Sequence, residues 1–231
     1  MARLYLFAEG QTEQTFANTV LKRHLGNFGV YMHKPSLIAH ARKKGRVHRG
    51  GGRNFRAMQN DINRRRKQES GNDVFFTTMV DLYGLHAKFP GAEEAEKLRH
   101  DPYRRLEALE KSWSDETGDS RFIPFIQLHE FEAYLFSDVS RFAFFFDNAD
   151  SQISALQRIV DDAQSPELID DGQHTAASKR IIAQFPEYSK TIVGPQMTEL
   201  IGLENIRSKC PHFNAWVERL EKLEAEPSER R

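Results

Sequence analysis

The sequence predicts an α/β protein, with a mostly parallel four-stranded sheet flanked by helices and a helical annex at the C-terminal end. Continuous apolar runs, rather than alternating ones, are typical of strands that are buried on both faces of a parallel sheet. Segments with helical periodicity separate these runs, and this alternation favours right-handed crossovers and a Rossmann-like arrangement. The strands are expected at residues 4–8, 30–38, 73–80 and 122–128.

The segments between the strands each show one apolar face at helical spacing. Thr12 is the expected N-cap of the first helix, and Asp101-Pro102 marks a point where the third helix restarts. Pro35 lies within the second expected strand and favours an edge position or a bend there. The helices are expected at about residues 12–25, 55–68 and 92–113.

The last third of the chain carries helical periodicity and no convincing strand pattern. We therefore expect a core over residues 1–140 and a helical annex packed on it over residues 141–224. Residues 225–231 are expected to form a disordered tail. The length of 231 residues fits one core with such an annex.

Composition indicates a globular protein of a reducing compartment. The single cysteine, Cys210, excludes an internal disulfide and a cysteine-rich zinc site, and it fits the cytoplasm. No apolar run is long enough to span a membrane, and the N-terminal run is too short for a signal peptide. We therefore expect a cytoplasmic protein with no membrane association.

The charges cancel over the whole chain, with 33 basic and 33 acidic residues, but their distribution is uneven. Between residues 40 and 67, Asp61 is the only acid. A local basic segment of this kind can follow a phosphate backbone, although a solvated charge run is the plainer interpretation. Arg49 and Arg53, beside the glycines of this segment, are the candidate nucleic-acid contacts.

Carboxylates follow three of the expected strands, at Glu9, at Asp81, and at Glu130 with Glu132. The carboxyl ends of parallel strands meet at one edge of a sheet, where ligands bind in open α/β folds. Oxygen ligands without cysteine suit Mg²⁺ or Mn²⁺, and such ions commonly serve phosphoryl chemistry. The sequence therefore predicts a magnesium or manganese site formed by these carboxylates.

Glu130 and Glu132 stand two residues apart at the start of an expected short helix, where they do not share a face. We therefore expect only one of them to reach the crevice, and Glu130 is favoured because it is closer to the strand. The alternative is that both acids merely complement the positive end of the helix.

Basic residues of the annex form a second set of candidate nucleic-acid contacts. Lys179 and Arg180 lie at a helix start with Thr175 as its expected N-cap, a position that suits phosphate binding. A capped surface helix is at least as good an interpretation. Arg207 and His212 could line the crevice, with His212 as a proton shuttle, although a lone histidine is more often structural.

These residues carry a resemblance to a known group of proteins. Glu9-Gly10 after the first strand and Asp81 after the third resemble the TOPRIM domain of primases, topoisomerases and OLD nucleases. More closely, the chain resembles the TOPRIM-like family of domain of unknown function 4276. The similar stretches, spread over nearly the whole chain, are EGQTE, DLYGL, QLHEFEAYLFSD, TAASKRI and GPQMTELIGLENIRSKCPHFNAWVERL.

The resemblance implies that Glu9 is a metal ligand or general acid/base, that Asp81 is a metal ligand, and that Glu130 or Glu132 completes the site. Tyr83 stands where the wider family has a second aspartate, which leaves one or two metals open. It also implies an ABC- or OLD-type ATPase partner in phage defence.

Two functions follow as expectations. The first is a metal-dependent, phosphodiester-cleaving nuclease that serves as a defence effector, with Glu9, Asp81 and Glu130 as its catalytic residues. The second is a non-catalytic module of the same fold that binds nucleic acid or a partner ATPase. The sequence leaves open DNA or RNA as the substrate, and whether the chain forms a homo-oligomer.

Overall fold

A parallel β-sheet forms the centre of the protein, in a computed structural model that describes residues 1–38, 55–82, 85, 88–169 and 175–223. The strand order is β2-β1-β4-β5, with β3 also beside β1 and β6 also beside β4. Every strand pair among the described residues is parallel, which confirms the predicted α/β class. The strands are β1 (Ala2–Ala8), β2 (Val30–Met32), β3 (Ser36–Leu37), β4 (Val74–Asp81), β5 (Phe122–Ile123) and β6 (Ile126–Gln127).

Two of the four expected strands are each divided in the structure, and a proline lies at each break. Pro35 separates β2 from β3, so the bend expected from this residue is confirmed. Pro124 lies between β5 and β6, where it cannot donate a hydrogen bond to the neighbouring strand. The hydroxyl of Thr78 bridges this gap: it donates to the carbonyl of Phe125 at 3.0 Å and accepts from the amide of Phe125 at 2.9 Å.

The helices of the N-terminal half follow the predicted order. The restart at Asp101 is confirmed, because its carboxylate accepts from the amide of Arg104 and caps the next helix. The prediction of Thr12 as an N-cap was wrong: the first helix begins at Gln11, with Gly10 as its cap. The elements are α1 (Gln11–Phe16), a π-helical turn η1 (Ala17–Leu21), α2 (Lys22–Gly26), α3 (Phe55–Gln68), α4 (Ala92–Lys97) and α5 (Pro102–Thr117).

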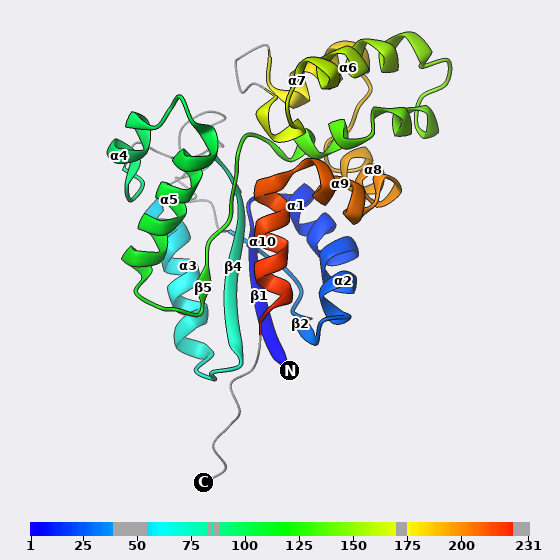
Figure 1. Cartoon of the computed structure of the whole chain (residues 1–231). Helices are drawn as coiled ribbons and strands as arrows, with labels where there is room; N and C mark the ends of the chain where they lie inside the picture. Colours follow the sequence, from blue (N-terminus) through cyan, green and yellow to red (C-terminus); the bar gives the residue numbers. More distant parts are fainter. Residues whose placement is uncertain (39–54, 83–84, 86–87, 170–174, 224–231) are drawn as a thin grey trace, which may run out of the picture.

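The C-terminal helices gather over the carboxyl ends of the strands, at the top of Figure 1. One exception is the last helix, which runs down one face of the sheet (Figure 1). The expected tail, residues 225–231, lies outside the described part of the chain. The elements are η3 (Phe131–Ser137), η4 (Val139–Phe144), α6 (Asp150–Asp162), η5 (Pro166–Leu168), α7 (Ala177–Gln184), α8 (Val193–Ile201), α9 (Leu203–Lys209) and α10 (Pro211–Glu221).

Alternate residues of β1 enter two separate hydrophobic cores, one on each face of the sheet. Leu4 and Leu6 pack with α1, α2, α10 and the C-terminal helices, whereas Tyr5 and Phe7 pack with α3 and α5 (Figure 1). Because side chains of a strand alternate between faces, a continuous apolar run is what such a strand requires. The C-terminal helices share the first of these cores with the sheet.

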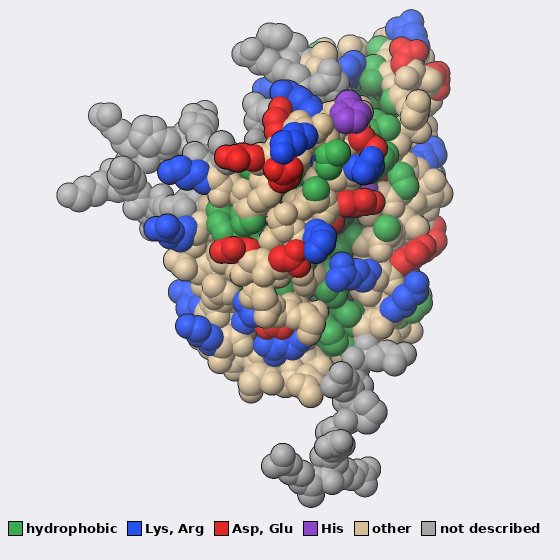
Figure 2. Space-filling model, turned by 60° about the vertical axis from the view of Figure 1, so that its left-hand side comes forward, with side chains coloured by type: hydrophobic (Ala, Val, Ile, Leu, Met, Phe, Trp, Pro, Cys, Tyr) green, Lys and Arg blue, Asp and Glu red, His purple; other side chains and the backbone are tan. Residues whose placement is uncertain are grey.

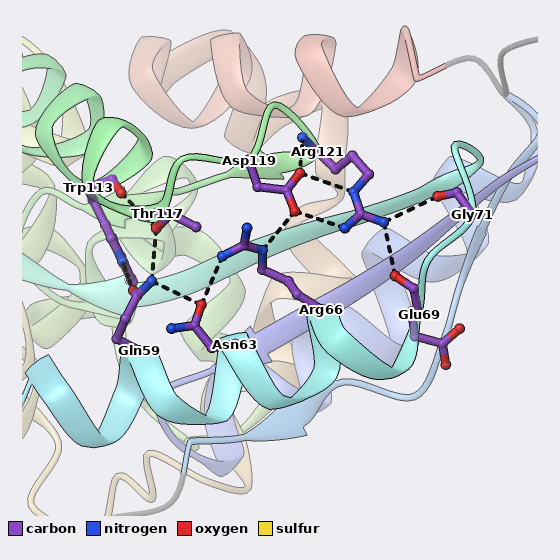
Figure 3. Close-up of polar contacts among 9 residues, drawn as sticks. All are labelled: Gln59, Asn63, Arg66, Glu69, Gly71, Trp113, Thr117, Asp119 and Arg121. Atoms are coloured by element: carbon purple, nitrogen blue, oxygen red, sulfur yellow. Dashed lines mark hydrogen bonds and ion pairs between the residues drawn. The ribbon is translucent and has the colours of Figure 1, made fainter.

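A polar network ties α3 to the turn before β5 (Figure 3). The carboxylate of Asp119 accepts hydrogen bonds from the guanidinium groups of Arg66 at 2.8 Å and of Arg121 at 2.8 Å. Arg121 also donates to the carbonyls of Glu69 and Gly71. The hydrogen bonds from Arg121, followed by those from Arg66, hold the pKa of Asp119 well below its usual range despite partial burial.

Asp119→Asn is expected to lower the free energy of unfolding at pH 7 by about 2 kcal/mol, because it removes a charge-assisted acceptor from two guanidinium groups. A carboxylate with a lowered folded pKa contributes stability above its unfolded pKa, about 3.9, and loses it as pH falls further. Urea unfolding should therefore show the difference at pH 7 and a smaller one at pH 3. Asp115→Asn is the control, because its pair with Lys111 is exposed; equal losses for both variants would contradict the prediction.

Candidate active site

Glu9 and Asp81 meet at the carboxyl edge of the sheet. Glu9 directly follows β1, and Asp81 is the last residue of the neighbouring parallel strand β4. The amide of Glu9 donates to the carbonyl of Met79 at 3.0 Å, which continues the strand pairing by one residue. The amide of Asp81 in turn donates to Oε2 of Glu9 at 2.7 Å. The two acids therefore lie side by side at the edge where ligands bind in this class of fold.

Glu130 and Glu132 converge on one ammonium group, that of Lys190. The Nζ atom of Lys190 lies 3.1 Å from Oε2 of Glu132 and 3.6 Å from Oε1 of Glu130. Burial would lower the pKa of Lys190, but the charges of Glu132 and Glu130, with a further contribution from Asp81, raise it. Lys190 thus connects this pair of acids electrostatically with the Glu9–Asp81 edge.

The prediction that only one of the paired acids reaches the crevice assumed helical spacing, which the backbone does not follow at Glu130. Glu130 is the N-cap of η3 and has an extended backbone, with φ −129° and ψ 157°, so helical spacing does not apply to it. Glu132 lies in the first turn of η3, and its side chain is only 3% exposed. An extended residue followed by a helical turn can direct two carboxylates, two positions apart, to the same partner.

Glu13 is a buried acid of the site that the sequence analysis missed. Its carboxylate reaches back to accept from the amide of Gly10 at 2.9 Å, so Glu13 caps its own helix just beside Glu9. Burial raises the pKa of Glu13, and the charge of Glu132 raises it further. An acid three residues after an N-cap is a recognisable capping pattern, so the signal was present in the sequence.

Lys190 was also missed, and no local pattern could have identified it. It lies between α7 and α8, and its contact with Glu132 joins residues 58 positions apart. Its carbonyl accepts from the hydroxyl of Thr12, at 3.3 Å, which links this segment to α1. Nearby, Gly194 permits close approach, because a Cβ there would lie 2.9 Å from the hydroxyl of Tyr188.

Buried polar groups beside Asp81 lack partners within the described part of the chain. Gln127 pairs in register with Asp81 across the parallel strands, so the two side chains are neighbours on one face. Gln127 is 2% exposed, and both of its side-chain amide atoms are buried without a hydrogen-bond partner among the described residues. The hydroxyl of Tyr134, which is fully buried, is in the same situation. Such groups indicate a place for water or a polar ligand.

The acidic side chains of this site fit a cation that is bound by two carboxylates better than a cation that is bound by four. Among the described residues, no group of three or more His, Cys, Asp or Glu side chains is arranged to hold a metal ion. Mg²⁺, however, is often bound by one or two carboxylates, with waters and substrate phosphates as its other ligands. Glu9 and Asp81 can supply that pair, and the unpartnered amide of Gln127 can bind a metal-bound water.

The predicted nucleic-acid contacts of the annex are mostly engaged within the protein. The start of α7 is capped by Glu130, whose Oε2 accepts from the amide of Ser178 at 3.0 Å, so Thr175 is not the N-cap. Arg180 donates to the carbonyl of Thr175 at 2.6 Å, whereas Lys179 is exposed. Arg49, Arg53 and Tyr83 lie outside the residues that the structure describes.

Arg207 and His212 pair with side chains other than the acids Glu9, Asp81, Glu130 and Glu132. Arg207 forms an ion pair with Glu221 and donates to Asn214 at 2.7 Å, which ties α9 to α10. His212 lies 3.1 Å from Oε1 of Glu110 on α5. Burial lowers the pKa of His212, but this hydrogen bond and the negative charge of Glu110 outweigh burial and raise it. The structural interpretation of both residues is therefore the better supported one.

Lys190→Met is expected to make stability fall as pH rises. Burial already raises the pKa of Glu132, and loss of the ammonium raises it further. A carboxyl group with a raised folded pKa contributes stability that is present below its unfolded pKa, about 4.3, and is lost as pH rises through the folded pKa. Relative to wild type, urea unfolding should show an additional loss of about 2 kcal/mol between pH 4 and pH 8, because the pair is partly exposed.

The double variant Lys190→Met with Glu132→Gln provides the internal control, because it removes both charges of the pair. It should not show the additional loss of stability between pH 4 and pH 8 that is expected of Lys190→Met alone. Lys111→Met provides the surface control, since Lys111 is 76% exposed in its pair with Asp115. If the stability of Lys190→Met relative to wild type did not change with pH, the pKa of Glu132 would not depend on the ammonium group of Lys190.

The fold and the site together define a class: a parallel α/β protein with carboxylates gathered at the carboxyl edge of its sheet and helices placed over that edge. The chain belongs to the family described as Domain of unknown function (DUF4276), which matches residues 8–221. Comparisons with curated proteins and with solved structures found no match. Of the helices described, none has the length and apolar character needed to cross a membrane.

Proposed function

We propose that this protein is a metal-dependent nuclease with a TOPRIM-like fold, which cleaves phosphodiester bonds at the carboxyl edge of its sheet. The hydrogen bond of 2.7 Å from the amide of Asp81 to Glu9 carries the proposal, because it fixes the carboxylate of Glu9 at the backbone of Asp81, so that both acids belong to one edge. Two neighbouring carboxylates repel each other unless a cation or proton compensates them, so this arrangement favours a divalent cation.

Each residue of the site has a distinct part in this proposal. Glu9 and Asp81 would hold Mg²⁺ or Mn²⁺, which supplies charge stabilisation at the phosphate and a more acidic bound water. Lys190, whose side chain is 44% exposed, is accessible to a phosphate oxygen of the substrate. Glu132 and Glu130 position its ammonium group beside the edge. Gln127, next to Asp81, can orient a water molecule through its unpartnered amide.

The test is a cleavage assay on single- and double-stranded DNA and RNA, with Mg²⁺, with Mn²⁺ and with EDTA. The proposal expects cleavage of at least one polymer that requires a divalent cation and stops in EDTA. Binding of Mn²⁺ measured by calorimetry should accompany this activity. Cleavage that persists in EDTA would overturn the metal-dependent mechanism.

The second candidate function is a non-catalytic module that binds nucleic acid or a partner ATPase of the ABC or OLD type. One observation favours it: Lys190 already compensates part of the negative charge of Glu130 and Glu132. Under this alternative, nucleic-acid or ATPase binding should occur without cleavage and should not require a divalent cation. Adding the ATPase to the cleavage assay separates the two, since an effector that needs its partner should then become active.

A further inference from the structure

One border of the sheet, residues 28–37 with the strands β2 and β3, leads to the proposed catalytic edge. Among the described residues, these two strands pair only with β1, on its side away from β4 (Figure 1). Tyr31 lies opposite Arg3 near the start of β1, and Leu37 lies opposite Ala8 at its end. Because Glu9 directly follows Ala8, this β2–β3 border runs beside β1 up to the acids.

Four side chains of the β2–β3 border, at every third position, are exposed: Phe28, Tyr31, Lys34 and Leu37. The exposed fractions of the three apolar ones are 48% for Phe28, 46% for Tyr31 and 43% for Leu37. The Nζ atom of Lys22 lies 5.9 Å from the centre of the Tyr31 ring, so a cation stands beside an exposed ring. Exposed aromatic rings next to cations are typical of surfaces on which nucleic-acid bases stack.

The charge of the border is positive and is not offset by acids of the same segment. No aspartate or glutamate occurs between Glu13 and Asp61 in the sequence. Lys22, Arg23 and Lys34 lie in this interval and form no ion pair with a described residue. Cations that have no acidic partner within the protein are available to the phosphates of a ligand.

Acids of the neighbouring elements are already paired. Glu221 of α10 contacts His24 on α2, but its side chain is only 11% exposed and also forms an ion pair with Arg207. On β1, Arg3 forms an ion pair with Asp73. By contrast, acidic and basic side chains are intermixed over much of the face that is turned forward in Figure 2. The β2–β3 border thus combines positive charge with exposed rings.

These features fit a nucleic-acid strand better than another protein. A polyanion gains from the cations through counterion release, and its bases can stack on Tyr31 and Phe28. A second copy of this chain would bring a second set of the same cations to a symmetric contact, where they would repel. A purely apolar partner would leave the cations without a counter-charge.

We propose that the β2–β3 border binds a single strand of nucleic acid and leads it to the Glu9–Asp81 edge. The inference rests on the proposed nuclease function and adds a binding surface that the carboxylates do not supply. A single strand is favoured because stacking on Tyr31 requires an unpaired base. At about 3.3 Å per residue, the six positions from Arg3, opposite Tyr31, to Glu9 correspond to about 20 Å along β1. An oligonucleotide can occupy both places, whereas a small phosphodiester cannot.

The test uses two variants of the border and two matched controls. Tyr31→Thr removes the ring but keeps a β-branched side chain that suits a strand, and Lys34→Gln removes one charge. Phe144→Thr is the control for the ring, because Phe144 is 67% exposed and its ring centre lies 5.9 Å from the guanidinium carbon of Arg141. Arg158→Gln is the control for the charge, because Arg158 is exposed on α6.

Fluorescence anisotropy measures the binding of a labelled single strand of about 20 nucleotides, as DNA and as RNA, and of the matching DNA duplex. The solutions contain EDTA and about 50 to 200 mM salt. Tyr31→Thr should weaken binding of the single strand about 10-fold. Lys34→Gln should weaken it about 3-fold and make the dependence of log K on log salt less steep by about 0.7. Both controls should bind like wild type, and circular dichroism verifies that each variant is folded.

The second measurement compares cleavage of the same strand with cleavage of bis(p-nitrophenyl) phosphate in Mn²⁺. Tyr31→Thr and Lys34→Gln should raise KM for the strand by about the factors by which they weaken binding. Their rates with the small ester should stay at the wild-type level, because the ester cannot reach from the acids to the border.

The outcomes separate this inference from the proposed function. Binding in EDTA that depends on Tyr31 and Lys34, without cleavage under any condition, would support the border and overturn hydrolysis. Cleavage of the strand with the wild-type KM in both border variants would overturn the border while the nuclease stands. The inference would also be overturned if wild type bound no strand in EDTA, if it bound duplex as tightly as single strand, or if it bound phosphatidylserine vesicles more tightly than nucleic acid.

Discussion

If the proposed nuclease function holds, Asp81→Asn and Glu9→Gln are each expected to reduce metal-dependent cleavage by at least about 100-fold, because each would remove a charged metal ligand, and even the loss of a partner of a metal ligand costs about 10- to 100-fold. The fold should survive both changes. The amide oxygen of glutamine at position 9 can still accept from the amide of Asp81, which now donates to Glu9 at 2.7 Å. Asparagine at position 81 leaves the backbone pairing of β4 unchanged.

The measurement is the initial cleavage rate of wild type and both variants at several Mn²⁺ concentrations, with calorimetric Mn²⁺ binding in parallel. Glu107→Gln is the matched control, because Glu107 is an exposed carboxylate on α5. Activity should remain at the wild-type level in that control. If Asp81→Asn or Glu9→Gln cleaved and bound Mn²⁺ like wild type, the two residues would not be metal ligands.

Trp113→Ala is expected to cost about 3 to 5 kcal/mol of stability, the largest loss we expect from a single substitution. Trp113 is fully buried in the core between α3, α5 and β5. Its ring lies 5.2 Å from the ring of Phe89 and 5.3 Å from that of Phe122. Its indole nitrogen donates to Oε1 of Gln59 at 2.8 Å, so alanine leaves both a cavity and a polar side chain without its donor.

Urea unfolding at pH 7 measures this loss. Trp113→Phe is the control that separates the two contributions, because it keeps most of the ring volume and removes only the hydrogen bond to Gln59. It should cost about 1 to 2 kcal/mol. If Trp113→Ala lowered the free energy of unfolding by less than about 1 kcal/mol, the core would have collapsed around the cavity. If Trp113→Phe and Trp113→Ala lowered it equally, the whole effect would come from the hydrogen bond to Gln59.

The comparison of strands shows how far local pattern determines this fold. Residues 4–8 and 73–80 were predicted as buried strands, and β1 and β4 occupy nearly these ranges at the centre of the sheet. Their uninterrupted apolar character follows from burial on both faces, a requirement that each strand meets within its own sequence. The last strand was predicted as continuous but is divided at Pro124, where the hydroxyl of Thr78 replaces the missing backbone pairing.

The placement of Glu9 and Asp81 followed from the sequence for the same reason. Parallel neighbours end at one edge of a sheet, so an acid after each strand must come close to the other. The proximity needs no knowledge of side-chain packing, only the order and direction of the strands. The structure joins the two residues through the amide of Asp81 and the carboxylate of Glu9.

Only the tertiary structure decided which charges surround that edge. Lys190 meets Glu132 across 58 positions, so no local period encodes this contact. The convergence of Glu130 and Glu132 depends on the extended backbone of Glu130 directly before η3. The sequence alone thus determined the parallel sheet and the two acids at its edge, because strand period and direction are local properties. The positions of Lys190 and of the buried acids near this edge depend instead on how helices that are distant in the sequence pack over it.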